Sequence, residues 1–141
     1  MDLETLSRED ALWLVSRVQV GRVVYTVGGL PAITPVNFAL DGESIVIRTS
    51  VDSGIARAVP GSVVAFQVDD IDTAAHTGWT VTIIGRAEDV RDAAEARRLS
   101  DLVHPWADAQ RDYVIRIDTG LVSGRRLQTH PDGDALIRFS G

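Results

Sequence analysis

The 141-residue sequence predicts a mainly β (α+β) fold, in which short strands form a closed or sandwiched core and helices lie outside it. Two observations predict this class. Several short stretches are rich in β-branched residues and end at glycine-containing turns, and helical periodicity appears only in segments between or before these strands. The length suits a single domain, expected to span residues 1–141, and an apolar fraction of 45% is enough for one packed core.

Three helices are expected. The first covers residues 7–18, where Ser7 followed by Asp10 resembles a capping box and precedes an apolar stripe. The second is a short helix or helical turn over residues 52–59. The third covers residues 91–103, which carry apolar side chains at helical spacing.

The strands are predicted from β-branched runs bounded by turn signals. Gly28-Gly29 and Asp41-Gly42 are typical of hairpin turns, and Pro35 must lie at an edge, bulge or bend because proline cannot donate to a strand ladder. The acidic run at residues 69–72 is interpreted as a solvated turn that closes a strand, in preference to a cation site. The expected strands are residues 21–27, 32–40, 44–49, 62–68, 79–87, 113–117 and a weaker one at 135–139.

Composition and motifs exclude several functional classes. The net charge is −6 and all 14 cationic residues are arginine, without a basic tract, so nucleic acid is not an expected partner. The absence of cysteine excludes disulfides and thiolate metal sites, and the three histidines, at 76, 104 and 130, lack ligand spacing, so no metal is expected. No dinucleotide, Walker A or nucleophile-elbow motif is present, and no residue stands out as a catalytic acid or base.

The start of the chain is acidic and polar, unlike a secretory signal. No apolar run approaches the roughly 20 residues that a membrane-spanning helix needs. A cytoplasmic protein without a membrane partner is therefore expected.

Six segments, in their order and spacing, resemble a known family. They are P-V-N-F-A-L-D-G at 35–42, I-V-I-R-T-S at 45–50, V-A-F-Q-V-D-D-I-D at 64–72, G-W-T-V-T-I-I-G-R-A-E-D-V at 78–90, Pro105-Trp106, and S-G-R-R-L at 123–127. Together they resemble the pyridoxamine 5′-phosphate oxidase-like, FMN-binding split β-barrel family, in its actinobacterial flavin and deazaflavin oxidoreductase branch. The resemblance covers roughly residues 5–128.

This resemblance implies a six-stranded antiparallel split β-barrel with flanking helices. It also implies a homodimer that holds FMN in grooves at the subunit interface. The expected function is that of a flavin-dependent oxidoreductase, which transfers hydride or electron pairs between a reduced nicotinamide and a small conjugated or nitro-bearing substrate.

The resemblance further implies which residues contact the flavin. The third strand and the loop after it would hold the phosphate and ribityl chain, the second strand would lie against the ring system, and the fifth strand would approach from the same or the other subunit. Carried onto this sequence, the three groups are Arg48, Thr49, Ser50, Ser53 and Gly54; Val36 and Asn37; and Trp79 and Thr80, with Trp106 and Arg125 near the ring edge.

These residue types suit a phosphate, because arginine presents a planar fork of donors, hydroxyls add short hydrogen bonds, and glycine lets backbone N–H groups come close. A helical turn starting near Ser53 would direct free N–H groups toward an anion. The chain departs from the family pattern at Ser53-Gly54-Ile55, where relatives often carry a lysine or arginine. The nearest cation here is Arg57, about one helical turn further on, and Arg57 or Arg48 is expected to take over the contact with the cofactor.

Other interpretations stay open. Arg48 can be a surface or interface arginine, Trp79 and Trp106 can be core or dimer anchors, and Arg125 can belong to a solvated pair. The flavin can be replaced by an 8-hydroxy-5-deazaflavin coenzyme. The chain can also be a non-catalytic flavin or haem carrier with a degenerate site, or a barrel dimer without a small ligand.

Overall fold

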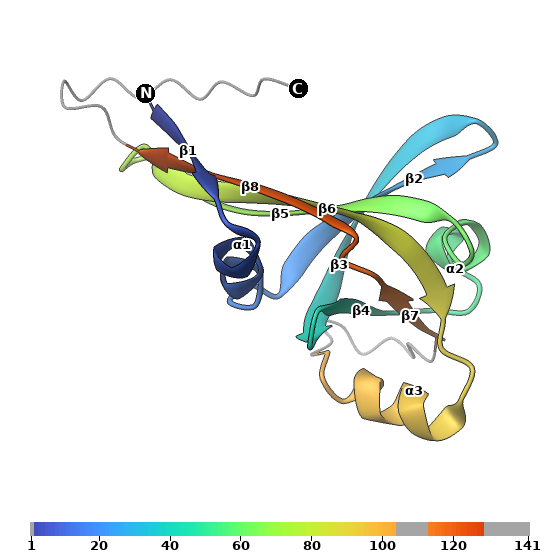
Figure 1. Cartoon of the computed structure of the whole chain (residues 1–141). Coiled ribbons are helices and arrows are strands. Elements are labelled where there is room, and N and C mark those ends of the chain that lie inside the picture. The colour runs from blue at the N-terminus through green and yellow to red at the C-terminus, as the bar shows by residue number, and fades with distance from the viewer. Residues whose placement is uncertain (1, 104–112, 129–141) are drawn as a thin grey trace.

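Six antiparallel strands close into a barrel in the computed structural model, which describes residues 2–103 and 113–128 (Figure 1). Around the barrel the order is β6, β5, β2, β3, β4 and β7, and β7 pairs with β6 to complete the ring. This architecture confirms the predicted mainly β barrel with helices outside it. The barrel strands are β2 (Val20–Val27), β3 (Leu30–Asp41), β4 (Ser44–Thr49), β5 (Val63–Asp72), β6 (Thr77–Asp89) and β7 (Tyr113–Ile117).

The three predicted helices are confirmed, and each is shorter than expected. Each begins after a side-chain oxygen that accepts a backbone N–H, supplied by Ser7, Ser53 and Asp92. Within the described part of the chain, no helix is long and apolar enough to cross a membrane. The helices are α1 (Arg8–Val15), α2 (Gly54–Ala58) and α3 (Ala93–Ser100).

Two further strands, which the sequence does not predict, extend the sheet beyond the barrel. Strand β8 (Leu121–Gln128) pairs with the first half of β6, and β1 (Asp2–Leu6) pairs with β8 along its length. Both lie toward the open edge of the sheet, where solvated positions weaken the hydrophobic alternation that identifies a strand. The strand expected at residues 135–139 lies outside the described residues.

The turn predicted at residues 69–72 is wrong, because these residues form the end of β5 and pair with β6 as far as Asp72 and Thr77. The turn comes later, where the Asp72 carboxylate accepts the N–H groups of Ala74 and Ala75, each at 3.0 Å. Acidic residues can continue the strand here because its outer positions face solvent.

Strand β3 changes partner along its length. Its residues 30–37 pair with β2, whereas residues 38–41 pair with β4. Among the described residues, Pro35 therefore has a strand neighbour on one side only. The predicted edge position of this proline is confirmed.

The barrel interior is apolar and densely packed. Phe66 meets Phe38 edge to face, with ring centroids 5.0 Å apart and planes at 72°. A smaller cluster lies outside the barrel wall, where Leu99 of α3 packs on Val46 of β4 and Val114 of β7. Strand β4 is thus covered on both faces, which explains its continuous apolar sequence.

Gly85 marks the point at which β6 leaves β8 and turns toward β7. Before it, Ile84 pairs with Leu121 of β8; after it, Ala87 pairs with Ile117 of β7. The Asp118 backbone crosses so close that a Cβ on Gly85 would lie 1.7 Å from the Asp118 carbonyl oxygen. Only glycine allows this crossing.

An ionic cluster fastens α3 to the barrel. The Arg98 guanidinium binds Asp41 at 2.9 Å and Glu95 at 2.6 Å, and Arg116 of β7 binds the same Glu95 at 2.9 Å. Hydrogen bonds from Arg98, and then from Arg116, lower the pKa of the Glu95 carboxyl from 4.5 to about 2. The hydrogen bond from Arg98 likewise lowers the pKa of Asp41.

Replacing Gly85→Ala should lower the free energy of unfolding by about 3 kcal/mol, because the backbone at Asp118 must move to admit the methyl group. Denaturant unfolding followed by circular dichroism measures this loss. The matched control is Gly54→Ala, since a Cβ there meets only the Tyr25 hydroxyl at 3.9 Å. Equal stability of the two variants would contradict the proposed crossing constraint.

The ionic cluster should make the free energy of unfolding depend on pH in the acidic range. Because the folded-state pKa of Glu95 lies below its unfolded value, its contribution is complete above about pH 4.5 and is lost as pH falls toward 2. Glu95→Gln should therefore flatten the decline of unfolding free energy across this range. Glu88→Gln, which removes an exposed carboxylate 4.0 Å from Arg86, is the control and should leave the decline as in the parent.

Candidate functional site

The loop after β4 brings three predicted residues together in one hydrogen-bonded turn. Thr49 is buried at the end of β4, and its hydroxyl donates to the Ser53 hydroxyl at 2.9 Å. Ser53 also accepts the N–H of Ala56 at 3.1 Å and so caps α2. The Ser50 hydroxyl donates to the Asp52 carboxylate, and this hydrogen bond is the main reason why the pKa of Asp52 is lowered. The turn is thus held in place without a ligand.

A groove lies between this turn and the tip of the β2–β3 hairpin. Its volume is about 540 Å³, within the range of small-molecule sites. Gly54 and Arg57 of α2 form one wall, and Thr26 and Gly28 of the hairpin belong to the other. Two residues from the predicted set, Gly54 and Arg57, therefore border the same cavity.

Arg57 provides the positive charge of the groove. Its Nη2 donates to the Asp52 carbonyl at 2.6 Å, which fixes the guanidinium while using one of its five N–H donors. Because α2 has only five residues, its dipole adds little at this point. An anion in the groove would be bound chiefly by Arg57.

Arg48 lies on the other side of β4. Its Nη1 donates to the carbonyls of Ser100 and Val103, at 3.1 Å and 3.4 Å, where α3 ends. Strand alternation explains this separation, because Arg48 shares a face with Val46 under α3, whereas Thr49 faces the opposite way. The structure thus gives Arg48 a helix-capping contact, and its predicted contact with a flavin phosphate stays a prediction.

Val36 and Asn37 lie at the middle of β3, opposite Gly21 and Val20 of β2. Val36 is half-buried and packs against the barrel core. Neither residue lines the groove beside α2. They are placed at the point where β3 passes from β2 to β4.

The predicted residues on β6 and β8 lie far from the groove. Trp79 is buried in the main core, which agrees with the interpretation of this residue as a core anchor. Thr80 faces the opposite side of β6 and accepts from Gln67 at 3.2 Å, and Arg125 lies directly across from it on β8. The end of β6 that carries them and α2 lie at opposite ends of the sheet (Figure 1). Trp106 lies outside the described residues.

Hydroxyl groups at the hairpin tip were not predicted as part of the site. Tyr25 and Thr34 share a hydrogen bond of 3.0 Å, and the Tyr25 hydroxyl lies 3.9 Å from the position that a Cβ of Gly54 would take. Thr26 lines the cavity beside them. The Gly28-Gly29 turn signal locates this tip, but only the fold shows that it reaches α2.

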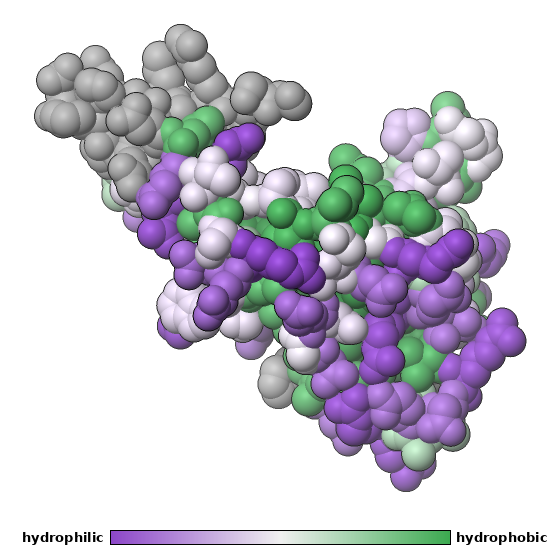
Figure 2. All heavy atoms as spheres, viewed as in Figure 1, coloured by the Kyte–Doolittle hydropathy of each residue, from purple (hydrophilic) through white to green (hydrophobic). Residues whose placement is uncertain are grey.

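A row of apolar residues, three of them exposed and two half-buried, crosses the outer face of the sheet. We call it the apolar row; Figure 2 shows apolar surface along this side of the molecule. The row joins neighbouring strands in register from β8 to β3, and three of its members are 67%, 40% and 65% exposed (Leu121, Ile84 and Ile33). Its members in order are Leu121, Ile84, Ala65, Val24 and Ile33.

Comparisons with known proteins give relatives that cover most of the chain. The uncharacterized protein Rv0080 of Mycobacterium tuberculosis is 37% identical over 127 residues, covering 86% of this chain and 84% of the relative. The FAD binding protein from Mycobacterium smegmatis has a similar structure, with a TM-score of 0.72, 27% identity, and coverage of 90% of this chain and 100% of the other.

A conserved protein of unknown function from Corynebacterium diphtheriae, DIP1874, is also similar, with a TM-score of 0.73, 34% identity, and coverage of 87% and 96%. The family model described as pyridoxamine 5′-phosphate oxidase matches residues 7–126. With the barrel topology, this match shows that the chain belongs to the pyridoxamine 5′-phosphate oxidase family.

Proposed function

We propose that the chain binds a flavin nucleotide in the groove between the β2–β3 hairpin and α2, and that it works as a flavin-dependent oxidoreductase. The observation that carries this proposal is the position of Arg57 on a cavity of about 540 Å³ beside Gly54. A structural relative at 27% identity is an FAD binding protein, which supports a flavin of the FMN or FAD type.

Each part of the groove suits a part of the cofactor. The Arg57 guanidinium carries N–H donors for a phosphate, and its contact with the Asp52 carbonyl orients it in advance. The absence of a side chain at Gly54 leaves room for close approach of the ligand to the backbone. Thr26 of the β2–β3 hairpin lies on the opposite wall and adds a polar residue there.

The chemistry would come from the cofactor, since a bound flavin supplies hydride or electron-pair transfer. The described residues that line the groove include one charged group, Arg57, and neither a carboxylate nor a histidine. The chain's part is then to bind, orient and shield the cofactor. The same observation favours a second candidate, a non-catalytic flavin carrier, which would bind the cofactor without reducing a substrate.

We also propose that a second copy covers the apolar row. Large exposed apolar patches on a soluble protein mark interaction surfaces, and a row of five apolar residues in register forms an even surface that can pack against its own copy. A two-fold axis running across the strands would place the Thr80 end of one sheet over the α2 end of the other. The partner's Thr80 and Arg125 would then approach the groove. Within a single chain these two residues lie far from it.

Arg57→Ala should weaken flavin binding by roughly tenfold to over a hundredfold, because a charge-assisted hydrogen bond contributes about 1.5–3 kcal/mol. Titrations with FMN, FAD and an 8-hydroxy-5-deazaflavin coenzyme, followed by fluorescence, measure this and identify the preferred cofactor. The matched control is Arg48→Ala, which should leave affinity nearly unchanged and lower stability by about 1 kcal/mol through loss of the α3 contacts. A larger loss of affinity in the Arg48 variant would place the phosphate there instead.

Ile84→Glu should convert a dimer into a monomer, because it puts a charge within the apolar row. Sedimentation velocity at micromolar concentration measures the change. Leu102→Glu is the matched control, since Leu102 has the same 40% exposure as Ile84 and lies beside α3, outside the row. A parent protein that sediments as a monomer would reject the shared groove while leaving the Arg57 test intact.

A further inference from the structure

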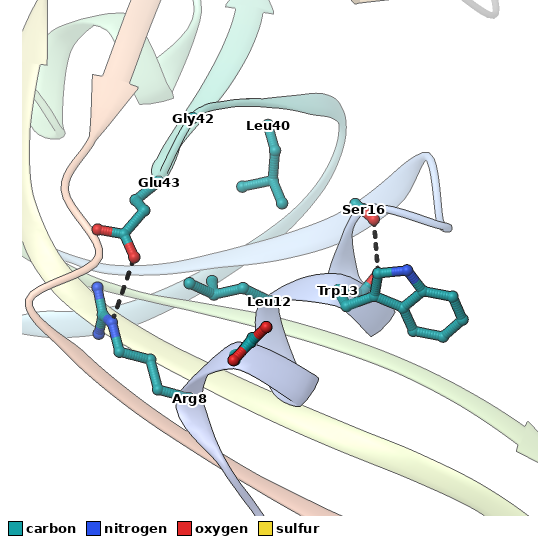
Figure 3. A pocket seen from close by; sticks show the side chains of 8 residues that line it. Arg8, Leu12, Trp13, Ser16, Leu40, Gly42 and Glu43 are labelled. Atoms are coloured by element: carbon teal, nitrogen blue, oxygen red, sulfur yellow. Dashed lines mark hydrogen bonds and ion pairs between the residues drawn. The ribbon is translucent and has the colours of Figure 1, made fainter.

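A second groove lies between α1 and the β3–β4 turn, on elements that the proposed flavin site does not use (Figure 3). Its volume is about 620 Å³, enough for a small organic molecule. Figure 3 shows Leu12 of α1 and Leu40 of β3 projecting into the space between the helix and the turn. Both leucines also pack against the barrel core, so this apolar floor is held rigidly.

One wall of the groove is an exposed indole. Trp13 is 58% exposed on α1, which is a large apolar area to leave in water. The Arg17 guanidinium lies 5.1 Å from the ring centroid, four residues along the chain, so the ring already accepts a cation. Trp13 therefore offers both apolar area and affinity for positive charge.

The rim of the groove is acidic. Glu9 stands in the first turn of α1, and Glu43 follows Gly42, whose positive φ of 62° sets the β3–β4 turn. Among the described residues, the Glu9 carboxylate has no cation within 4.0 Å, whereas Glu43 has the Arg8 Nε at 3.6 Å. Two carboxylates thus oppose one guanidinium on the groove lining.

The Arg8 guanidinium is held by hydrogen bonds within the chain. Its Nη2 donates to the backbone carbonyl of Thr119 at 2.7 Å and to the Thr119 hydroxyl at 2.8 Å. These bonds hold the guanidinium against the loop between β7 and β8. The charged side chains that line the groove, Glu9, Glu43 and Arg8, thus carry a formal charge of −1, beside an aromatic wall and an aliphatic floor. Arg17, which lies against the indole, is not among the lining residues.

We propose that this groove binds small organic cations with an apolar body, such as arylalkyl amines. The ammonium group lies between the Glu9 and Glu43 carboxylates, and the apolar body covers Leu12, Leu40 and the indole of Trp13. Neutral molecules lack the charge pairing, and carboxylates are repelled by the acidic rim.

Isothermal titration of the full chain at pH 7 tests the proposal with 2-phenylethylamine, 2-phenylethanol, 3-phenylpropanoate and methylamine. The aromatic amine should bind once per chain and at least about tenfold more tightly than the three others, because it alone combines charge with apolar area. Equal affinities for the amine and the carboxylate would overturn the proposal.

Variants locate the site. Glu9→Gln should weaken binding of 2-phenylethylamine by about fivefold to tenfold, whereas Glu88→Gln, the control on the far strand β6, should leave it unchanged. In nuclear magnetic resonance spectra, the indole N–H signal that disappears in Trp13→Phe should shift when the amine is added to the parent protein. Unchanged affinity in the Glu9 variant, or a Trp13 signal that does not move, would reject this groove as the site.

Discussion

The structure depends on one backbone crossing, where β6 passes from the open sheet into the closed barrel. On one side of Gly85 the strand pairs with β8, and on the other side it pairs with β7. The Asp118 backbone fills the space that a side chain at residue 85 would occupy. The backbone N–H of Asp118 donates to the backbone carbonyl of Arg86 at 3.0 Å. Because one long strand serves two neighbours in succession, the barrel closes and yet leaves a sheet that continues outward.

The closed barrel and the open sheet differ in what stabilises them and in the surfaces that they carry. The closed half, with β4, β7 and α3, is held by a second apolar cluster and by the cluster of Asp41, Glu95, Arg98 and Arg116. The open half carries the apolar row on one face and α1 on the other. The groove that we propose for the flavin lies where the hairpin of the open sheet reaches the short helix at the barrel end, so its walls come from segments about 30 residues apart.

Much of the fold follows from the sequence because local signals agree with the final pairing. Strands β4 and β7 have the expected bounds, since each is bounded by turn residues and buried. Strand β8 was missed because half of its positions are solvated, and the end of β5 was missed because Asp69 and Asp70 suggest a turn. In both places tertiary pairing overrides local preference.

The candidate site was less predictable than the fold. Sequence order placed Thr49, Ser53, Gly54 and Arg57 near one another correctly, because a short helix directly follows the strand. It could not show that Arg48 turns toward α3, since one residue of strand register decides the face on which a side chain lies. Nor could it reveal the contribution of the hairpin tip, which depends on how far β2 and β3 extend beyond the barrel.

The extended β2–β3 hairpin also decides whether another chain can add a strand to this sheet. Over residues 30–37 β3 has β2 as its only strand neighbour among the described residues, so its outer margin would invite strand addition by another chain. Pro31 and Pro35 are four residues apart and occupy equivalent positions in the ladder, where neither can present an N–H. The margin is therefore a poor template for intermolecular sheet growth.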